Sequence, residues 1–206
     1  MIAGLAEAVA ENGMFLAGAL HEDGNTLVLL MADTTFWPIL QAAPEFGQPD
    51  PVDRYSTRVI TQLADRFGAM AEFPFGGPPY APFLRWAVAS SRAWSSPVGM
   101  LVHDTAGLMI SYRGALRFQA FLPLPPTRDA SPCKTCMDKP CLGACPVGAL
   151  GSPQGYDVSA CHEFLDTPPG ASCVDHGCRV RRACPVSQVF GRDPAQSAHH
   201  MKAFHP

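Results

Sequence analysis

Apolar residues in the first 120 positions gather in short runs of strand length. Two such runs, residues 15–20 and 26–32, lie on either side of a turn-like polar segment, which predicts two strands. Residues 98–103 and 108–118 predict two further strands around a turn at 104–107. A shorter apolar run at residues 70–75 predicts another strand, which ends in a loop rich in glycine and proline.

Other apolar residues recur at helical spacing. Residues 1–12 and 81–93 predict helices, and Asp50-Pro51 is a strong helix start, with Asp as the cap and Pro in the first turn. Gly68 is the expected end of that helix. Its buried face is predicted to carry four apolar residues: Val52, Tyr55, Val59 and Leu63. The front of the chain is therefore expected to be α+β.

Composition divides the 206 residues into two parts. A proline-rich stretch at 122–132 is typical of a linker, so we expect domains at 1–125 and 126–206. The first has 7 Lys+Arg against 11 Asp+Glu and the second 8 against 7. This charge balance argues against nucleic acid or a membrane as a partner. No run approaches the length of a membrane span, and the start has no basic segment typical of a signal. A cytoplasmic protein is expected.

The eight cysteines carry the chemistry that the sequence predicts most clearly. All lie between Cys133 and Cys184, and clustered thiols in a chain without an export signal are better read as metal ligands than as disulfides. They form two sets, each of which ends in Cys-Pro. The first set is Cys133, Cys136, Cys141 and Cys145, and the second is Cys161, Cys173, Cys178 and Cys184. Eight thiols with this repeated ending predict two [4Fe–4S] clusters, and zinc is the main alternative.

This module resembles the dicluster ferredoxins over about the last 75 residues. In bacterial dicluster ferredoxins the cysteine before proline ligates the other cluster, and its proline suits the first turn of a helix that follows. The resemblance implies that Cys133, Cys136, Cys141 and Cys184 hold one cluster. It implies that Cys145, Cys161, Cys173 and Cys178 hold the other. Several spacings are longer than the usual pattern, which leaves the pairing in the second set open.

The front part shows a second resemblance, to the cobalamin-processing CblC proteins. The matching segments follow the same order: residues 24–37, 50–55, 97–103, 111–114 and 122–126. A domain of this kind joined to two clusters is also similar to epoxyqueuosine reductase and the reductive dehalogenases. The resemblance implies a nitroreductase-like domain followed by a small ferredoxin-like one. It also implies a cobalamin held with its lower base detached and reduced by the clusters, which a reducing donor protein would supply with electrons.

The same resemblance suggests residues that would contact a corrinoid. Aromatic rings could cover the corrin face, the glycine-rich loop could let backbone approach it, and polar side chains could bind its amides. These candidates are Phe36, Trp37, Phe75, Gly76, Gly77, Pro78, His103, Tyr112 and Arg113. Each has a plainer explanation as a core, loop or strand-end residue.

Several functions remain open at this point. The leading one is an oxidoreductase-type corrinoid protein fed by two clusters, with the substrate undetermined. A ferredoxin-type carrier with a docking domain is the second, and a flavin enzyme that binds FMN is the third. A tRNA-modifying enzyme is disfavoured because no basic stripe is present. Three histidines near the end, His199, His200 and His205, are expected in a solvated or docked tail. Three arginines, Arg179, Arg181 and Arg182, are expected to balance cluster charge or to attract a donor.

Overall fold

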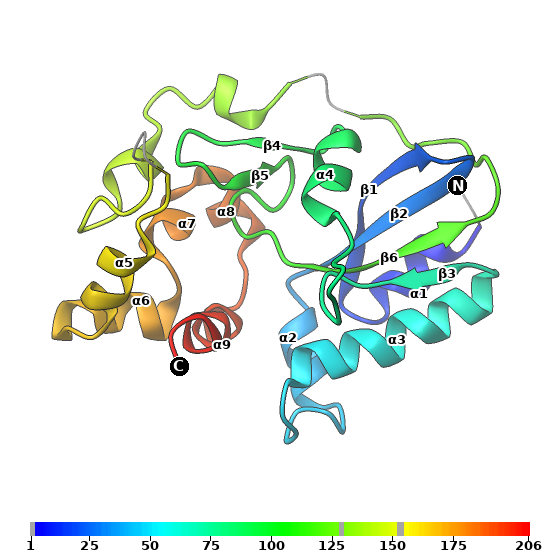
Figure 1. Cartoon of the computed structure of the whole chain (residues 1–206), viewed down its shortest axis with the longest axis horizontal. Coiled ribbons are helices and arrows are strands. Elements are labelled where there is room, and N and C mark those ends of the chain that lie inside the picture. Colours follow the sequence, from blue (N-terminus) through cyan, green and yellow to red (C-terminus); the bar gives the residue numbers. More distant parts are fainter. Residues whose placement is uncertain (1–2, 128–129, 152–154) are drawn as a thin grey trace. The chain divides into compact units, whose positions relative to one another are not determined.

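The chain forms two compact units (Figure 1), and the computed structural model describes residues 3–127, 130–151 and 155–206. The sheet unit consists of Met1–Arg92 and Ser111–Asp129. The cysteine unit consists of Ala93–Ile110 and Ala130–Pro206. Residues 93–110, which lie before the sequence boundary at 125, therefore group with the cysteines rather than with the sheet.

The sheet unit contains a four-stranded antiparallel sheet in the order β1-β2-β6-β3. Its strands are β1 (Met14–Glu22), β2 (Asn25–Ala32), β3 (Met70–Glu72) and β6 (Tyr112–Phe118). Strands β1 and β2 pair from Met14 opposite Ala32 to Glu22 opposite Asn25, so the two strands and the turn predicted here are confirmed. With its helices, the unit is mixed α+β.

One face of this sheet carries the main apolar core. Alternation along a strand places Val28, Leu30 and Leu116 on this face. They pack with buried residues of three helices: α1 (Leu5–Ala10), α2 (Phe36–Gln41) and α3 (Pro51–Phe67). Ile60 of α3, which is fully buried, belongs to this cluster. The long α3 therefore supplies much of the cover for the sheet.

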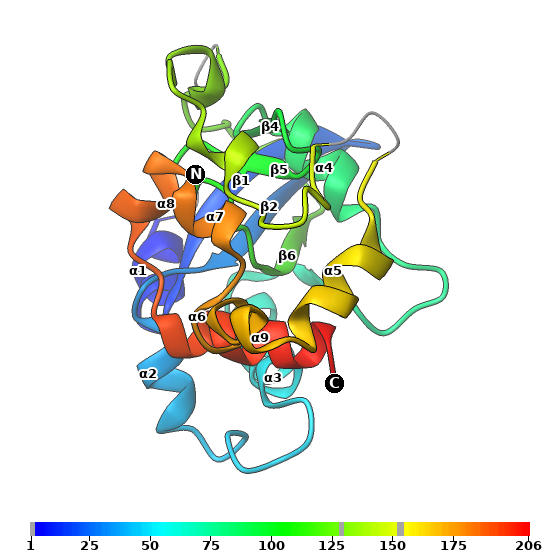
Figure 2. The ribbon, with the colours of Figure 1, turned by 90° about the vertical axis from the view of Figure 1, so that its left-hand side faces the viewer.

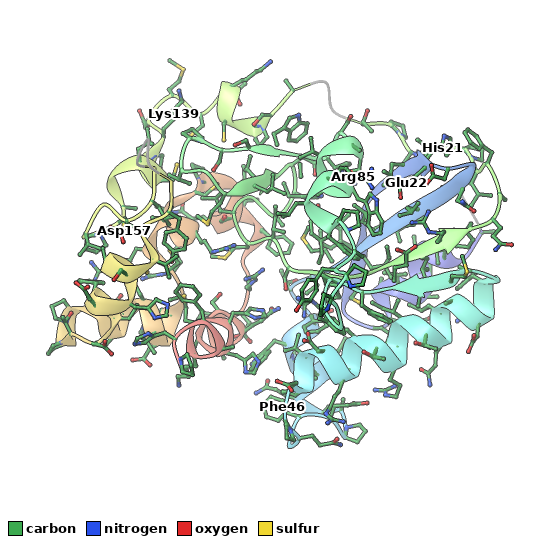
Figure 3. All side chains as sticks on the ribbon, in the orientation of Figure 1. His21, Glu22, Phe46, Arg85, Lys139 and Asp157 are labelled. Carbon is green, nitrogen blue, oxygen red and sulfur yellow. The ribbon has the colours of Figure 1, made fainter. Side chains whose placement is uncertain are left out.

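The opposite face carries a polar network beneath α4 (Phe83–Ala89). Trp86 is buried and donates its indole N–H to the carboxylate of Glu22, with both N···O distances at 2.9 Å. The same carboxylate pairs with Arg85 at 2.6 Å and Arg117 at 3.2 Å, and Figure 3 shows Glu22 and Arg85 in the same region. Burial raises the pKa of Glu22 and these donors lower it, with a net lowering.

Helix α3 follows the sequence prediction except at its cap. It begins at Pro51, buries the four predicted residues and ends at Gly68, which has a left-handed φ of 66°. Asp50 is the N-cap residue as expected, but it has a φ of 50° and its carboxylate makes no cap hydrogen bond. Pro51, whose φ already suits a helix, begins α3 without a hydrogen bond from the Asp50 side chain.

Other elements are shorter than the sequence predicts or pair differently. The strand expected at 70–75 is only β3, since the loop rich in glycine and proline follows it, and the helix expected at 81–93 is only α4. The strands expected around the turn at 104–107 join different sheets. Strand β5 (Leu101–His103) pairs with β4 (Ala93–Ser95), whereas β6 joins the main sheet.

The cysteine unit is built from loops and short helices (Figure 2). Its helices are the 3₁₀ turns η1 (Pro132–Lys134), η2 (Pro140–Gly143) and η3 (Pro168–Gly170), then α5 (Val158–Leu165), α6 (Ala171–His176), α7 (Arg179–Ala183), α8 (Pro185–Phe190) and α9 (Pro194–Phe204). Its core is small, and Cys141 and Cys184 are part of it beside apolar residues such as Val102, Leu108 and Val180. Cysteine side chains therefore occupy core positions that aliphatic side chains would fill in a larger domain.

Residues 93–110 join this unit through contacts to its last helices. The Ser187 hydroxyl accepts a hydrogen bond from the Leu108 N–H at 2.8 Å, and Arg181 donates to the Leu108 carbonyl at 2.5 Å. At Gly107 an added Cβ would lie 2.5 Å from the backbone nitrogen of Ser187, so only glycine allows this approach. Among the described residues, no helix has the length and apolar character to cross a bilayer.

Candidate metal centres

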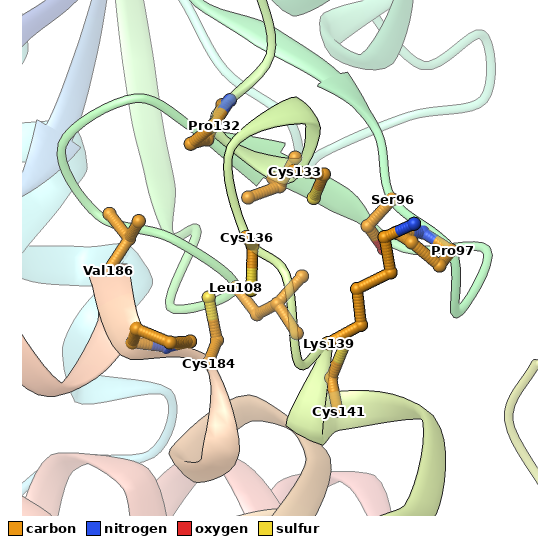
Figure 4. A pocket seen from close by; sticks show the side chains of 12 residues that line it. Ser96, Pro97, Leu108, Pro132, Cys133, Cys136, Lys139, Cys141, Cys184 and Val186 are labelled. Atoms are coloured by element: carbon orange, nitrogen blue, oxygen red, sulfur yellow. The ribbon is translucent and has the colours of Figure 1, made fainter.

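Four cysteines line one pocket of the cysteine unit, which we call the first cysteine pocket (Figure 4). They are Cys133, Cys136, Cys141 and Cys184. The rest of the wall is mostly apolar and includes Leu108 and Val186, with Ser96 and Lys139 as polar members. The space between its atoms is about 420 Å³, part of it open to solvent. This is the set that the resemblance to dicluster ferredoxins implies for one cluster, with Cys184 coming from the second run of cysteines.

Short turns hold these thiols. Cys133 lies in η1, where its N–H donates to the Ser131 hydroxyl at 3.2 Å, and Cys141 lies in η2. Cys184 is the N-cap of α8, and Pro185 occupies the first turn of that helix. The helix expected to follow this Cys-Pro pair is therefore confirmed.

The other four cysteines line the second cysteine pocket. They are Cys145, Cys161, Cys173 and Cys178. Cys161 lies in α5, Cys173 in α6, and Cys178 caps the start of α7. The space between the atoms is about 360 Å³, and the apolar wall includes Leu150, Leu165 and Val180. The long spacings of the second run therefore correspond to cysteines on separate short helices.

The helix expected after Cys145-Pro146 is wrong. The chain turns instead, with the Gly148 N–H bonded to the Cys145 carbonyl at 3.2 Å. Gly148 has a φ of 62°, a left-handed conformation that ends any helix there. The turn brings the Ala149 N–H to 3.3 Å from the Cys145 sulfur.

Electrostatic interactions among the thiols follow the same division. Burial raises the pKa of Cys133 and Cys141, and their cysteine neighbours in the first pocket raise it further. Burial also raises the pKa of Cys161, where the interacting thiols are Cys145, Cys173 and Cys178. The raised pKa values favour the protonated thiols of Cys133, Cys141 and Cys161 without a cation, whereas a bound metal would hold them as thiolates and release protons.

The thiols are not arranged around a single ion. Within the described residues, no three His, Cys, Asp or Glu side chains lie close enough together to hold one metal ion. Zinc requires its four sulfurs at about 2.3 Å from one point. A four-iron cluster takes one thiolate at each iron, so its sulfurs are spread more widely.

The second pocket has two polar neighbours, Tyr156 and Arg181, and the sequence pointed only to Arg181, as a residue expected to balance cluster charge or to attract a donor. Tyr156 donates its hydroxyl hydrogen bond to the Cys161 sulfur, which lowers the pKa of that thiol against the effect of burial. Arg181 interacts with Cys178, and burial lowers the pKa of its guanidinium. No carboxylate in the described part of the chain pairs with Arg181. Tyr156 belongs to no motif, so only the folded chain shows that it lies beside Cys161.

His205 and Arg182 make contacts within the cysteine unit, whereas Arg179 also lines the second cysteine pocket. His205 contacts His162 with a distance of 2.9 Å between their Nδ1 atoms, and its Nε2 lies 2.9 Å from Asp166. The tail is therefore docked, one of the two arrangements expected. Arg179 and Arg182 donate to backbone carbonyls of the same unit.

Two of the predicted corrinoid contacts are core residues. Phe36 is fully buried and meets Tyr55 edge to face at 5.5 Å. Trp37 is 5% exposed and meets Phe46 in the same way at 5.7 Å. Both belong to the main core of the sheet unit, so neither ring is available to a ligand in this arrangement.

Three further candidates lie in different surroundings. His103 belongs to the cysteine unit, is fully buried, and accepts hydrogen bonds at Nδ1 from the backbone of residues 105 and 106. Tyr112 is buried against Phe83, with 6.2 Å between ring centres. Arg113 pairs with Asp53 at 3.3 Å, and burial lowers the pKa of its guanidinium, which Asp53 partly offsets.

Phe75 and Gly76 do line a cavity of the sheet unit. This open cavity encloses about 1,040 Å³, including open solvent, and its other walls are mostly charged. They are Glu45, Gln48, Asp50, Asp53, Arg54, Thr57 and Arg58. Gly77 follows in the loop, where an added Cβ would lie 2.7 Å from the Tyr80 ring, and Pro78 is exposed. Of the predicted corrinoid contacts, only Phe75 and Gly76 belong to the lining of this cavity.

Comparison with known proteins does not assign the chain to a family. No protein-family model matches the chain, and a search of curated proteins finds no match.

Proposed function

We propose that this protein is an iron–sulfur redox protein whose cysteine unit holds two [4Fe–4S] clusters. The observation that supports this best is the division of eight cysteines into two pockets of four. Cys184 lines the pocket of the first three cysteines, and Cys145 lines the pocket of Cys161, Cys173 and Cys178, a crossing also found in two-cluster ferredoxins. When bound, such clusters store and transfer single electrons.

The residues of each pocket have defined parts in this proposal. The four thiolates each bind one iron, and the apolar walls limit the access of water. In the second pocket, the Ala149 N–H and the Tyr156 hydroxyl donate to cysteine sulfurs. Hydrogen bonds to the sulfurs favour the more negative, reduced state and are among the features that set the potential.

We further propose that the electron acceptor is a corrinoid bound by the sheet unit. Its support is the resemblance to CblC proteins, together with the open cavity lined by Phe75 and Gly76. The charged walls of this cavity offer both donors and acceptors to corrin amides. The alternatives are a carrier that passes electrons to a partner protein and a flavin enzyme.

Anaerobic purification followed by iron, sulfide and zinc assays tests the cluster proposal. We expect about eight irons and eight sulfides per chain, and a zinc protein without sulfide would contradict it. Hydroxocobalamin added to the purified protein tests the acceptor. A base-off spectrum that is lost in Phe75→Ser and kept in Phe121→Ser, an exposed ring outside the cavity lining, is expected. Eight irons without any spectral change would leave a carrier as the function.

A further inference from the structure

Ser96 lies in the turn between β4 and β5, and its backbone is fully hydrogen-bonded there. Its N–H donates to the Met100 carbonyl at 2.9 Å, and its carbonyl accepts from the Gly99 N–H at 3.0 Å. These two bonds fix the position of the residue within the hairpin. The turn itself therefore does not require the hydroxyl group.

The hydroxyl is buried without a partner. Ser96 is 7% exposed, and its oxygen has no hydrogen-bond partner among the described residues. Buried hydroxyl groups are normally paired, and one that is not calls for an explanation. A ligand that the described atoms do not include is one such explanation.

The position of Ser96 indicates which ligand. Ser96 lines the first cysteine pocket with its four thiols, and Figure 4 shows it on the same side as Cys133 and Lys139. Lys139 is exposed at its end of the pocket, so Ser96 is the buried donor in this wall. Among the described residues, no serine belongs to the lining of the second cysteine pocket, where the hydroxyl donor is Tyr156 instead. The two pockets therefore have different hydroxyl donors.

We propose that the Ser96 hydroxyl donates a hydrogen bond to a sulfur of the cluster in the first pocket. This inference rests on the proposed function. The acceptor is a cysteine thiolate or an inorganic sulfide, both of which carry more negative charge when the cluster is reduced. The bond is therefore stronger in the reduced state and raises the reduction potential of the first cluster. Ser96 is therefore a positioning residue, because it binds no iron and acts only through the reduction potential of the first cluster.

Ser96→Ala removes the hydroxyl with little change in shape. The matched control is Ser111→Ala in the sheet unit, where Ser111 is equally buried, at 6%, and its hydroxyl also has no partner among the described residues. Both variants are titrated anaerobically and followed by the electron paramagnetic resonance of the reduced clusters. In Ser96→Ala we expect the reduced-to-oxidised ratio of one cluster to fall about tenfold at a fixed potential, which is 59 mV for one electron. The other cluster and the control should match the parent protein.

Two unchanged potentials in Ser96→Ala would overturn the inference, as would an equal shift in Ser111→Ala. If Ser96→Ala does not assemble its clusters, Ser96→Thr and Ser96→Val provide the comparison, since they differ only in a hydroxyl against a methyl group. A lower potential in the Val variant supports the bond, and equal potentials contradict it. Eight irons in the parent protein with no shift would reject the role of Ser96 while leaving the two clusters in place.

Discussion

The two units of this protein are stabilised in different ways. The sheet unit buries a large apolar core between an antiparallel sheet and the helix α3, with residues such as Leu30 and Ile60 fully buried. The cysteine unit has a two-stranded sheet, short helices and a small core that includes Cys141 and Cys184. We expect a unit with so little aliphatic core to depend on the proposed clusters for stability, as small metal-binding domains commonly depend on their metals. The sheet unit does not.

Removal of the clusters should have the largest effect, and it should affect the cysteine unit but not the sheet unit. Anaerobic chelation of iron leaves buried thiols without a partner at the centre of the cysteine unit. We expect the amide protection of α5–α8 to be lost, while α3 and the strands β1 and β2 keep theirs. Hydrogen exchange measured by mass spectrometry on the full chain, before and after chelation, reports both units at once. Unchanged protection of α5–α8 would mean that the thiols are not needed for the fold.

Double substitutions of cysteine test how the two pockets share the ligands. Cys184→Ser and Cys141→Ser belong to the same pocket, so together they should leave about four irons per chain. Cys184→Ser with Cys178→Ser should lose both clusters, because these cysteines belong to different pockets. Iron and sulfide assays after anaerobic purification decide the matter. If the second pair kept about four irons, each run of cysteines would close its own cluster.

A core substitution should affect the sheet unit alone. Ile60→Ala removes a fully buried side chain, which we expect to cost about 2–5 kcal/mol of unfolding free energy. Leu84→Ala, at a side chain 71% exposed on α4, is the control and should change stability by under about 0.5 kcal/mol. Denaturant unfolding followed by hydrogen exchange gives the free energy of each unit. A loss of iron in Ile60→Ala would show that the units are coupled.

Arg181→Gln should give the smallest effect and sharpen the contrast between the two pockets. The guanidinium interacts with Cys178 and has no carboxylate partner in the described residues, so its charge favours the reduced state of the second cluster. We expect the reduced-to-oxidised ratio of that cluster to fall up to about tenfold, or 59 mV. Lys202→Gln, an exposed change of the same charge in the same unit, is the control.

The variants at Ser96 and Arg181 also test each other. They should move the potentials of different clusters, because the two residues neighbour different pockets. A double variant should then show both shifts at full size. If both variants moved the same potential, the assignment of at least one residue to its pocket would be wrong.

The sequence anticipated the elements whose signals are local. Strands β1 and β2 and the helix α3 follow from apolar runs, from Pro51 and from Gly68, because each signal lies within a few residues of the element that it specifies. The helix expected after Cys145 is wrong, and Asp50 caps α3 without a side-chain hydrogen bond, since backbone angles at Gly148 and Asp50 are set by the loops around them.

What the sequence determined by itself was the number and spacing of the cysteines, and from these the two sets of four. Spacing carries this information because a cluster needs several thiols from one short loop. Only the tertiary structure decided which neighbours those thiols have. Ser96 is 37 residues before the first cysteine, Cys133, and lies before the linker, yet it lines the first cysteine pocket. Arg181, by contrast, is only three residues after Cys178, with which it interacts. Residues 93–110 reach the cysteines through Ser187 and Arg181, and no local pattern could predict contacts between segments so distant in the chain.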